Sequence, residues 1–359
     1  MPHPRLRHQI AFVLAATAIG AAPVLAQSGY EPPLRANDLA PDERYSAGIH
    51  SDGNETQLRA KDIGARRLAA NNVWTGLKAG KNDKTVLANW VVYGKPFYAM
   101  APGVVVACWR NAPENVPGSH HIQFKAGNMP NGGNHLFIKH DDGTHALYAH
   151  ASTGSIPASL CPHNAALLSS KARDGGAPNM IVETKVTGGA RVTLGQKLGE
   201  IGNTGASSGP HLHVHVVKGN VAQPMPFRRG MTTPLIADRA DINGPWLRLK
   251  GTEMGEREEL FWAPHKQGSY TFKGVLAADY QRMVDHLADS ELMPGLITCA
   301  DNGATYDSSW SPEQGKNWAS FNAMTPVEAA AKHNQYTLKG YQRTSSYTCG
   351  PYTVAVWKK

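Results

Sequence analysis

The sequence predicts a mainly β protein, in which an antiparallel β domain is followed by a small C-terminal α+β module. Between Val91 and Val217, short alternating apolar runs are separated by Gly, Asn and Pro, which is typical of antiparallel strands joined by tight turns. The stretch HDDG (140–143) fits a hairpin turn, because Asp-Gly favours positive φ angles. From about residue 269, a helix followed by a strand occurs twice.

The chain begins with a segment that is typical of a secretory signal peptide. Arg5 and Arg7 precede an apolar run from Ile10 to Ala21, and the small residues at 24–26 suit cleavage before Gln27. An N-terminal membrane anchor is the alternative, but the run is short for a membrane span, and no later segment is apolar enough for one. We therefore expect a signal peptide over 1–26 and a secreted or periplasmic mature chain.

Charge and cysteine content narrow the function classes. The formal net charge is +8, but the basic residues do not form the blocks that nucleic-acid binders carry, so no nucleic-acid partner is expected. Four cysteines in an exported chain suggest two disulfides, and the simplest pairing joins Cys108 to Cys161 and Cys299 to Cys349. The chain has no Cys-x-x-Cys pair, which argues against a thiolate zinc site.

Changes in composition and in the strand pattern divide the mature chain into parts. The polar segment 27–72 predicts an irregular arm, and 73–235 the β domain. Residues 153–185 interrupt the strand rhythm of that domain and predict a long surface insertion. Residues 236–268 predict a linker before the module at 269–359.

The C-terminal module is expected to contain two repeats. In the first, a helix is followed by a Pro294-Gly295 stop and a strand; in the second, Thr-Pro starts the helix, Gly340 follows it and Trp357 lies near the end. A cysteine follows the post-glycine apolar segment in each copy. We expect two repeats packed as one unit and joined by a disulfide. The tail loosely resembles tandem repeat modules attached to some secreted bacterial hydrolases.

The stretch SSGPHLHVHVV places three histidines at alternate positions. On a β-strand, His211, His213 and His215 would share one face. The apolar residues between them would face the other side. A row of imidazoles can bind a divalent metal, transfer protons or line a polar groove.

The segment from Val91 to Val217 resembles the lysostaphin-like (LytM-type) zinc endopeptidases, which cut peptidoglycan cross-links. The resemblance covers about a third of the chain and implies a lysostaphin/LytM-like antiparallel β domain. It depends on stretches that occur in the family's order: YGKPFYAMAPGVVV, NHLFIKHDDGTHALYAHAS and VTLGQKLGEIGNTGASSGPHLHVHV.

The resemblance implies a zinc ion held by two histidines and one aspartate, with a fourth position open to water. His213 matches the metal ligand of the His-x-His pair. His150, in the Tyr-x-His stretch, and His211 match the two catalytic histidines that do not bind metal, which handle protons and stabilise the oxyanion. His215 lies beyond the matched pair, where a supporting role is expected rather than metal ligation.

The other two metal ligands of the family are missing at their usual place. The family takes them from a His-x-x-x-Asp element before the Gly-x-Pro strand, where this chain reads KNDKTVLANWVVYGKPF. The two matching registers, Lys84/Ala88 and Thr85/Asn89, contain no such pair. The candidate replacement ligands are His50, Asp83 and His163.

Strand alternation predicts that Tyr148 shares the groove face with His150. His135, His140 and His145 lie on or beside a hairpin and are expected to be structural or exposed to solvent.

The sequence therefore favours a peptidoglycan-directed protein with impaired or absent catalysis, which binds the cell wall or regulates a cell-wall hydrolase. The alternative is an active zinc endopeptidase with replacement ligands, which cleaves peptidoglycan cross-links or Gly-rich proteins. A third hypothesis is a structural envelope protein whose groove is vestigial. Whether the chain is an enzyme depends on whether the site binds zinc.

Overall fold

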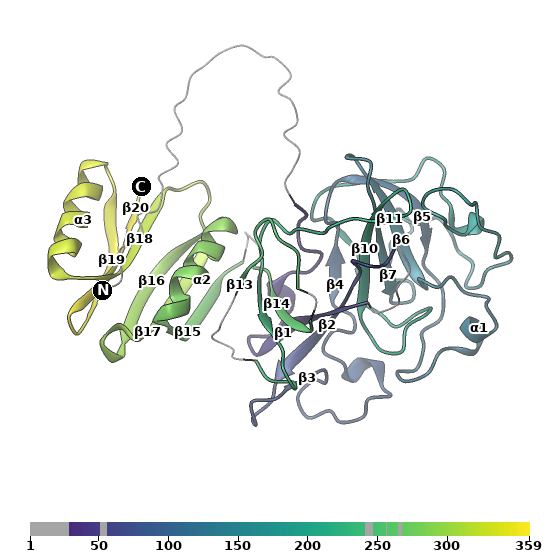
Figure 1. The fold of residues 1–359 in the computed structure, drawn as a ribbon, viewed down its shortest axis with the longest axis horizontal. Helices are drawn as coiled ribbons and strands as arrows, with labels where there is room; N and C mark the ends of the chain where they lie inside the picture. The colour runs from purple at the N-terminus through teal and green to yellow at the C-terminus, as the bar shows by residue number, and fades with distance from the viewer. Residues whose placement is uncertain (1–28, 51–55, 241–246, 256, 265–267) are drawn as a thin grey trace, which may run out of the picture.

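The computed structural model is built mainly from antiparallel strands, which confirms the mainly β class (Figure 1). Its described residues are 29–50, 56–240, 247–255, 257–264 and 268–359. The expected signal peptide, 1–26, lies outside them. Within the described part of the chain, no helix combines the length and apolar character that a membrane span needs.

A large antiparallel sheet forms the body of the protein, in the order β13-β12-β14-β1-β2-β10-β7-β6-β5-β8, with β3 beside β2 and β11 beside β10. Its strands are β1 (Glu43–Ile49), β2 (Lys61–Leu68), β3 (Trp74–Thr75), β5 (Gly103–Trp109), β6 (Asn134–His140), β7 (His145–Ala151), β8 (Arg191–Val192), β10 (Leu212–Lys218), β11 (Val221–Ala222), β12 (Met231–Pro234), β13 (Leu247–Arg248) and β14 (Glu259–Trp262). A separate pair, β4 (Pro96–Tyr98) and β9 (Lys197–Glu200), packs into the same core. Among the described residues of this part, the only α-helix is α1 (Ile122–Lys125), which is a single turn.

The hydrophobic core lies on one face of this sheet, which leaves the opposite face free for polar side chains. Leu212, Val214 and Val216 of β10 are at most 1% exposed and pack in that core. The histidines that alternate with them therefore face away from the core, as the spacing predicts.

The N-terminal segment differs from the irregular arm expected over 27–72. β1 and β2 form a hairpin with unbroken register from Glu43↔Arg67 to Ile49↔Lys61, and β2 also pairs with β10. The sequence hid these strands because Ile63 is the only β-branched residue among the positions described as buried. The others include the small residues Ser46, Ala47 and Ala65 and the charged residues Glu43 and Lys61.

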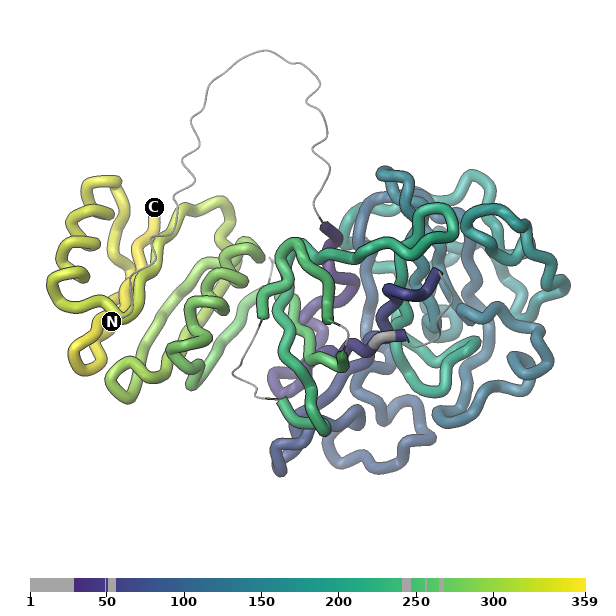
Figure 2. The backbone as a smooth tube through the Cα atoms, viewed as in Figure 1, coloured from purple at the N-terminus to yellow at the C-terminus, as the bar shows by residue number. Residues whose placement is uncertain are grey.

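The segment expected as a linker, 236–268, also contributes strands. β14 pairs with β1 on one side and β12 on the other, although β1 and β14 lie far apart in the sequence (Figure 2). The short strand β13 continues the sheet beyond β12. These strands thus extend the sheet beyond β1, toward the C-terminal module.

Residues 153–185, all of them described, contain no strand and one short 3-10 helix, Val182–Thr184. This agrees with the surface insertion that the sequence predicts. The expected disulfide between Cys108 on β5 and Cys161 is present, with a Cα–Cα distance of 5.6 Å. It fixes the insertion to the sheet.

The C-terminal part consists of two β-α-β-β repeats (Figure 1). Each forms a three-stranded antiparallel sheet with one helix. The first contains β15 (Tyr270–Leu276), α2 (Ala277–Asp289), β16 (Leu292–Ala300) and β17 (Thr305–Pro312); the second contains β18 (Trp318–Met324), α3 (Pro326–Leu338), β19 (Gln342–Cys349) and β20 (Tyr352–Lys358). Side chains of the first repeat share a hydrophobic cluster with Trp74, Met231 and Trp262 of the large sheet.

The two repeats match each other in detail. Both first strands have a register shift at the same place, at Phe272/Val275 and at Phe321/Met324. The expected disulfide joins the equivalent strands β16 and β19 through Cys299 and Cys349.

The helix signals of the second repeat act as predicted, whereas one signal of the first does not. Thr325 caps α3 through a capping box with Glu328, and Gly340, with a φ of 78°, follows its end. Pro294-Gly295, expected to stop the first helix, lies inside β16, where the strand shifts register. A bulge tolerates proline, and α2 has already ended at Asp289.

Replacing Cys299 and Cys349 together by serine should destabilise the module by about 2–4 kcal/mol, because the disulfide restricts the unfolded chain. Thermal unfolding of the full chain measures this as a lower Tm. A reductant should lower the Tm of the natural chain by more than that of the double variant, in which Cys108–Cys161 is the disulfide left to reduce. An unchanged Tm in the double variant would contradict a stabilising role.

Candidate functional site

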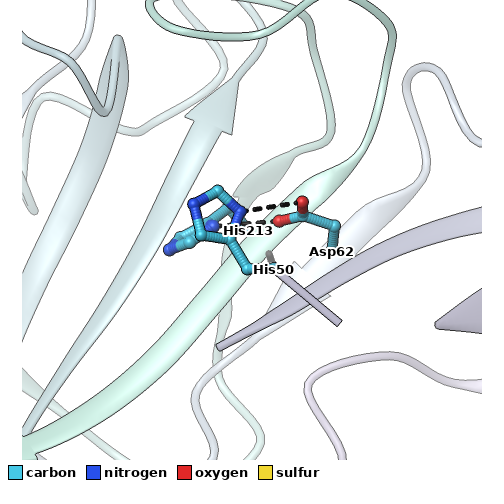
Figure 3. Close-up of side chains that lie close together, drawn as sticks. All are labelled: His50, Asp62 and His213. Carbon is cyan, nitrogen blue, oxygen red and sulfur yellow. Dashed lines mark hydrogen bonds and ion pairs between the residues drawn. The ribbon is translucent and has the colours of Figure 1, made fainter. Parts of the chain in front are cut away.

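Register across three strands brings an aspartate next to the histidine row. His213 on β10 lies opposite Asp62 on β2, and β1 leads directly into His50 at the same end of the β1–β2 hairpin as Asp62. The His213 Nδ1 and Asp62 Oδ1 atoms are 2.9 Å apart, and His50 Nδ1 is 3.0 Å from Asp62 Oδ2 (Figure 3). We call His50, Asp62 and His213 the triad.

The geometry of the triad fits a zinc ion. One donor atom from each residue lies within 4.8 Å of the other two. Zinc bonds to imidazole nitrogen and carboxylate oxygen are about 2.0–2.2 Å long, so that donors at the corners of a tetrahedron are about 3.3 Å apart. Two imidazoles and one carboxylate are also a donor set of catalytic zinc sites. A zinc ion would fit between these side chains with small adjustments.

Of the candidate replacement ligands, the structure brings only His50 to His213. Asp83 is exposed, and its carboxylate accepts hydrogen bonds from the backbone and hydroxyl of Thr85. His163 belongs to the insertion and stacks on Trp109 of β5, with ring centroids 5.5 Å apart. Neither belongs to the triad, and the acid that does, Asp62, was not among the candidates. The sequence feature that could have identified Asp62 is the alternation of β2, which places Asp62 on the face opposite Ile63.

The two histidines with expected catalytic roles lie beside the triad. The rings of His150 and His211 are 4.7 Å apart between centroids, and the His150 ring is 5.8 Å from that of His213. His150 Nδ1 donates to the Thr204 carbonyl at 2.8 Å, and His211 Nδ1 donates to the Gly209 carbonyl at 2.8 Å. In each ring Nε2 is therefore the atom left for chemistry, and Nε2 of His211 is 3.5 Å from Asp62 Oδ1.

His150 reaches the groove by breaking the alternation of its strand. Leu147 and Ala149 of β7 line the groove, whereas Tyr148 is fully buried in the core and accepts a hydrogen bond from Met100 N. The expectation that Tyr148 shares the groove face with His150 is therefore wrong. His150 has a φ of +68°, a left-handed conformation that turns its ring to the groove side.

Burial and the Asp62 charge set the protonation states. Burial lowers the pKa of His150 well below its usual value, and neighbouring imidazoles lower it further. Burial alone would raise the pKa of Asp62, but hydrogen bonds from His211 and His213 outweigh it and lower that pKa. Burial also lowers the pKa of His213, against the attraction of Asp62. Burial alone would lower the pKa of His211, but the hydrogen bond to Asp62 and the charge of that carboxylate outweigh it and raise the pKa. At neutral pH the site thus offers an ionised Asp62 carboxylate and a neutral His213 imidazole, which are the forms that bind metal.

His215 supports the ring of His213 from behind. Its Nδ1 atom is 2.9 Å from Nε2 of His213, and its side chain is buried. Burial lowers the pKa of His215 to about 3, so it is a neutral hydrogen-bond partner. When Nδ1 of His213 binds a metal, its Nε2–H can donate to His215, which is how a buried partner fixes the ring and tautomer of a metal-binding histidine.

A cavity of about 720 Å³ opens beside the triad. His50, His150, His213 and His215 line one part of it, together with His135, whose Nδ1 donates to the Gly133 carbonyl at 2.8 Å. The sequence interpretation set His135 aside as structural or exposed to solvent; it is buried and borders the cavity. The remaining lining comes from β6, β7, β10, the insertion and loop residues at 56–57, 130–132, 206 and 220.

The chain is similar to lysostaphin-type peptidase structures. One is the catalytic domain of lysostaphin from Staphylococcus simulans, with 18% identity over 52% of this chain and 90% of that one and a TM-score of 0.25. Another is a zinc-containing peptidase from Vibrio cholerae, with 18% identity over 46% and 48% and a TM-score of 0.21. The chain thus spans about half the length of the second structure.

A third similar structure is the SpoIIIAH–SpoIIQ complex, with 15% identity over 56% of this chain and 92% of that one and a TM-score of 0.24. No family model matches the chain, and no curated protein matches its sequence. None of these likenesses assigns a role to a residue. The roles proposed below come from the geometry of the site.

Replacing Asp62 by asparagine should abolish tight zinc binding, because the triad loses its only carboxylate. Asp83→Asn is the matched control, since it removes an exposed aspartate outside the triad. Titration of the purified full chain with zinc should give one site per chain for the natural protein and for Asp83→Asn. Loss of zinc binding in Asp83→Asn but not in Asp62→Asn would contradict this assignment.

His215→Ala should weaken zinc binding by about 10–100-fold, because His213 loses the partner that orients it. His145→Ala is the control, since His145 lies on the neighbouring strand β7 and its ring contacts Phe137 rather than the triad. Competition with a chelator of known affinity measures both. Equal affinities for the two variants would show that His215 fills space only.

Proposed function

We propose that the chain is an exported, zinc-dependent endopeptidase that cleaves peptide bonds of cell-wall peptidoglycan. The observation that supports this most directly is the approach of His50 and Asp62 to His213, next to His150 and His211. The case for an impaired site depended on the missing His-x-x-x-Asp element. His50 and Asp62 supply the same two donor types from the β1–β2 hairpin, so the alternative with replacement ligands is the one that the geometry favours.

His50, Asp62 and His213 would hold the metal. Zinc in such a site lowers the pKa of a bound water toward neutrality and polarises the carbonyl that is attacked. Since His150 donates through Nδ1 to a carbonyl, its Nε2 carries a lone pair that can accept a proton from the attacking water. His211 is oriented in the same way by the Gly209 carbonyl and is placed to stabilise the developing oxyanion or protonate the leaving amine.

Several features support an exported protein that acts on the wall. The two disulfides are compatible with an oxidising compartment outside the cytosol. The formal charge of +8, which becomes +6 (8 − 2) when Arg5 and Arg7 leave with the signal peptide, favours approach to an anionic envelope polymer. The motifs between Val91 and Val217 resemble those of peptidases that cut peptidoglycan.

Replacing His150 or His211 by alanine should lower the rate of fragment release from cross-linked peptidoglycan by about 100-fold or more, because each removes a proton-transfer or oxyanion-stabilising group. Zinc stoichiometry should stay at one per chain. His213→Ala should lose both zinc and activity, and His163→Ala, which changes a histidine of the insertion outside the triad, should keep both.

Two results would contradict the proposal. A natural chain that binds no zinc and releases no fragments would return the interpretation to a non-catalytic protein, and a sacculus pull-down would then separate a wall binder from a vestigial groove. Zinc binding with full activity in His150→Ala would contradict the catalytic role of His150.

A further inference from the structure

The cavity beside the triad has two chemically different ends. One is the histidine end described above. The other is apolar, and we call it the apolar end. It is lined from the sheet by Phe137, Leu147 and Val217 and from the insertion by Pro178, Met180 and Ile181.

The floor of the apolar end is part of the sheet itself. Phe137 and Val217 belong to a small hydrophobic cluster that is separate from the main core, and Leu147 and Met180 pack against it. The ring of Phe137 meets the His215 ring edge-on, with centroids 6.3 Å apart. Because His215 contacts His213, the apolar end begins one side chain away from the triad.

The insertion builds the opposite wall. The chain folds back on itself over residues 172–182, which we call the wall hairpin: Val182 N donates to the Ala172 carbonyl at 2.7 Å, and Arg173 pairs with Ile181. Asn179 N donates to the Asn220 side chain at 3.2 Å, which attaches the wall hairpin to the turn after β10.

The base of the wall hairpin is anchored to the sheet. Asp174 pairs with Lys185 at 2.8 Å, and Val186 N donates to the Val106 carbonyl of β5 at 2.9 Å. The disulfide at Cys161 holds the start of the insertion to the same strand. The wall is therefore a fixed part of the cavity.

The apolar end is also unsuited to a charged ligand. Among the described residues that line the cavity, Arg173 is the only lysine, arginine, aspartate or glutamate, and its side chain is exposed at the rim. A charged group that entered the apolar end would lose its hydration and would find no oppositely charged side chain among the described residues there. An apolar side chain, by contrast, gains affinity of about fourfold for each methylene that leaves water.

We infer that the apolar end is a specificity pocket for one large, uncharged apolar side chain of the substrate, next to the bond that is cleaved. The inference rests on the proposed zinc-peptidase chemistry rather than on peptidoglycan as the substrate, and it adds peptides with a large apolar side chain to the substrate class. A peptide with leucine or phenylalanine at this position should be preferred over a run of glycines by about 100-fold. A polyglycine bridge fills none of this pocket.

The test compares quenched fluorescent peptides Gly-Gly-X-Gly-Gly, with X as glycine, alanine, leucine or phenylalanine, cleaved by the zinc-loaded full chain. The kcat/KM should rise with the size of X. Met180→Gln and Leu147→Asn, which roughly keep the outline of the side chain but place an amide in the apolar end, should remove most of that preference. Val182→Thr is the matched control, because Val182 belongs to the same hairpin but is 47% exposed and does not line the cavity.

A binding measurement separates this inference from the proposed function. Labelled peptides of the same series are titrated against the chelator-treated full chain and followed by fluorescence anisotropy. Tighter binding of the leucine peptide than of the glycine peptide, lost in Met180→Gln and kept in Val182→Thr, supports the pocket even if no peptide is cleaved. Equal binding and equal cleavage of the two peptides overturn the pocket and leave the zinc peptidase intact.

Discussion

The carboxylate of Asp62 is the point on which the histidine cluster depends. It lies within 3.0 Å of nitrogens of His50 and His213 and 3.5 Å from His211. These histidines come from the end of β1, from β10 and from the turn before β10. Buried imidazoles need polar partners, and one partly buried carboxylate serves all three. The same carboxylate completes a zinc donor set, so the interaction that orders the side chains is also the one that a metal would replace.

This arrangement is fixed by strand register rather than by spacing along the chain. Ile49 pairs with Lys61, so His50 stands at the hairpin end beside Ala60, and Asp62 is its diagonal neighbour. A slip of one residue between β2 and β10 would turn Asp62 into the core and bring Ile63 to the groove.

The parts of the site that local pattern controls could be predicted from the sequence, and the parts set by distant pairing could not. Alternation alone placed His213 opposite the core. The hairpin carrying Asp62 was hidden because its buried positions mix small and charged residues with few β-branched ones, and because its partners, β10 and β14, are remote in sequence. The alternation rule failed at Tyr148 and His150, since one left-handed residue reverses the face at the end of β7.

The two ends of the cavity depend on different parts of the fold. The histidine end stands on β10, whose reverse face carries Leu212, Val214 and Val216 into the core, so a change of backbone there disturbs core packing as well. The wall hairpin contributes only Met180 to a hydrophobic cluster, and a disulfide, one ion pair and a few backbone hydrogen bonds hold it in place. Substitutions in the wall hairpin therefore cost little folding energy. Substitutions in the wall hairpin can thus change which substrate side chain the cavity accepts. The geometry of the residues that would bind zinc and move protons stays fixed.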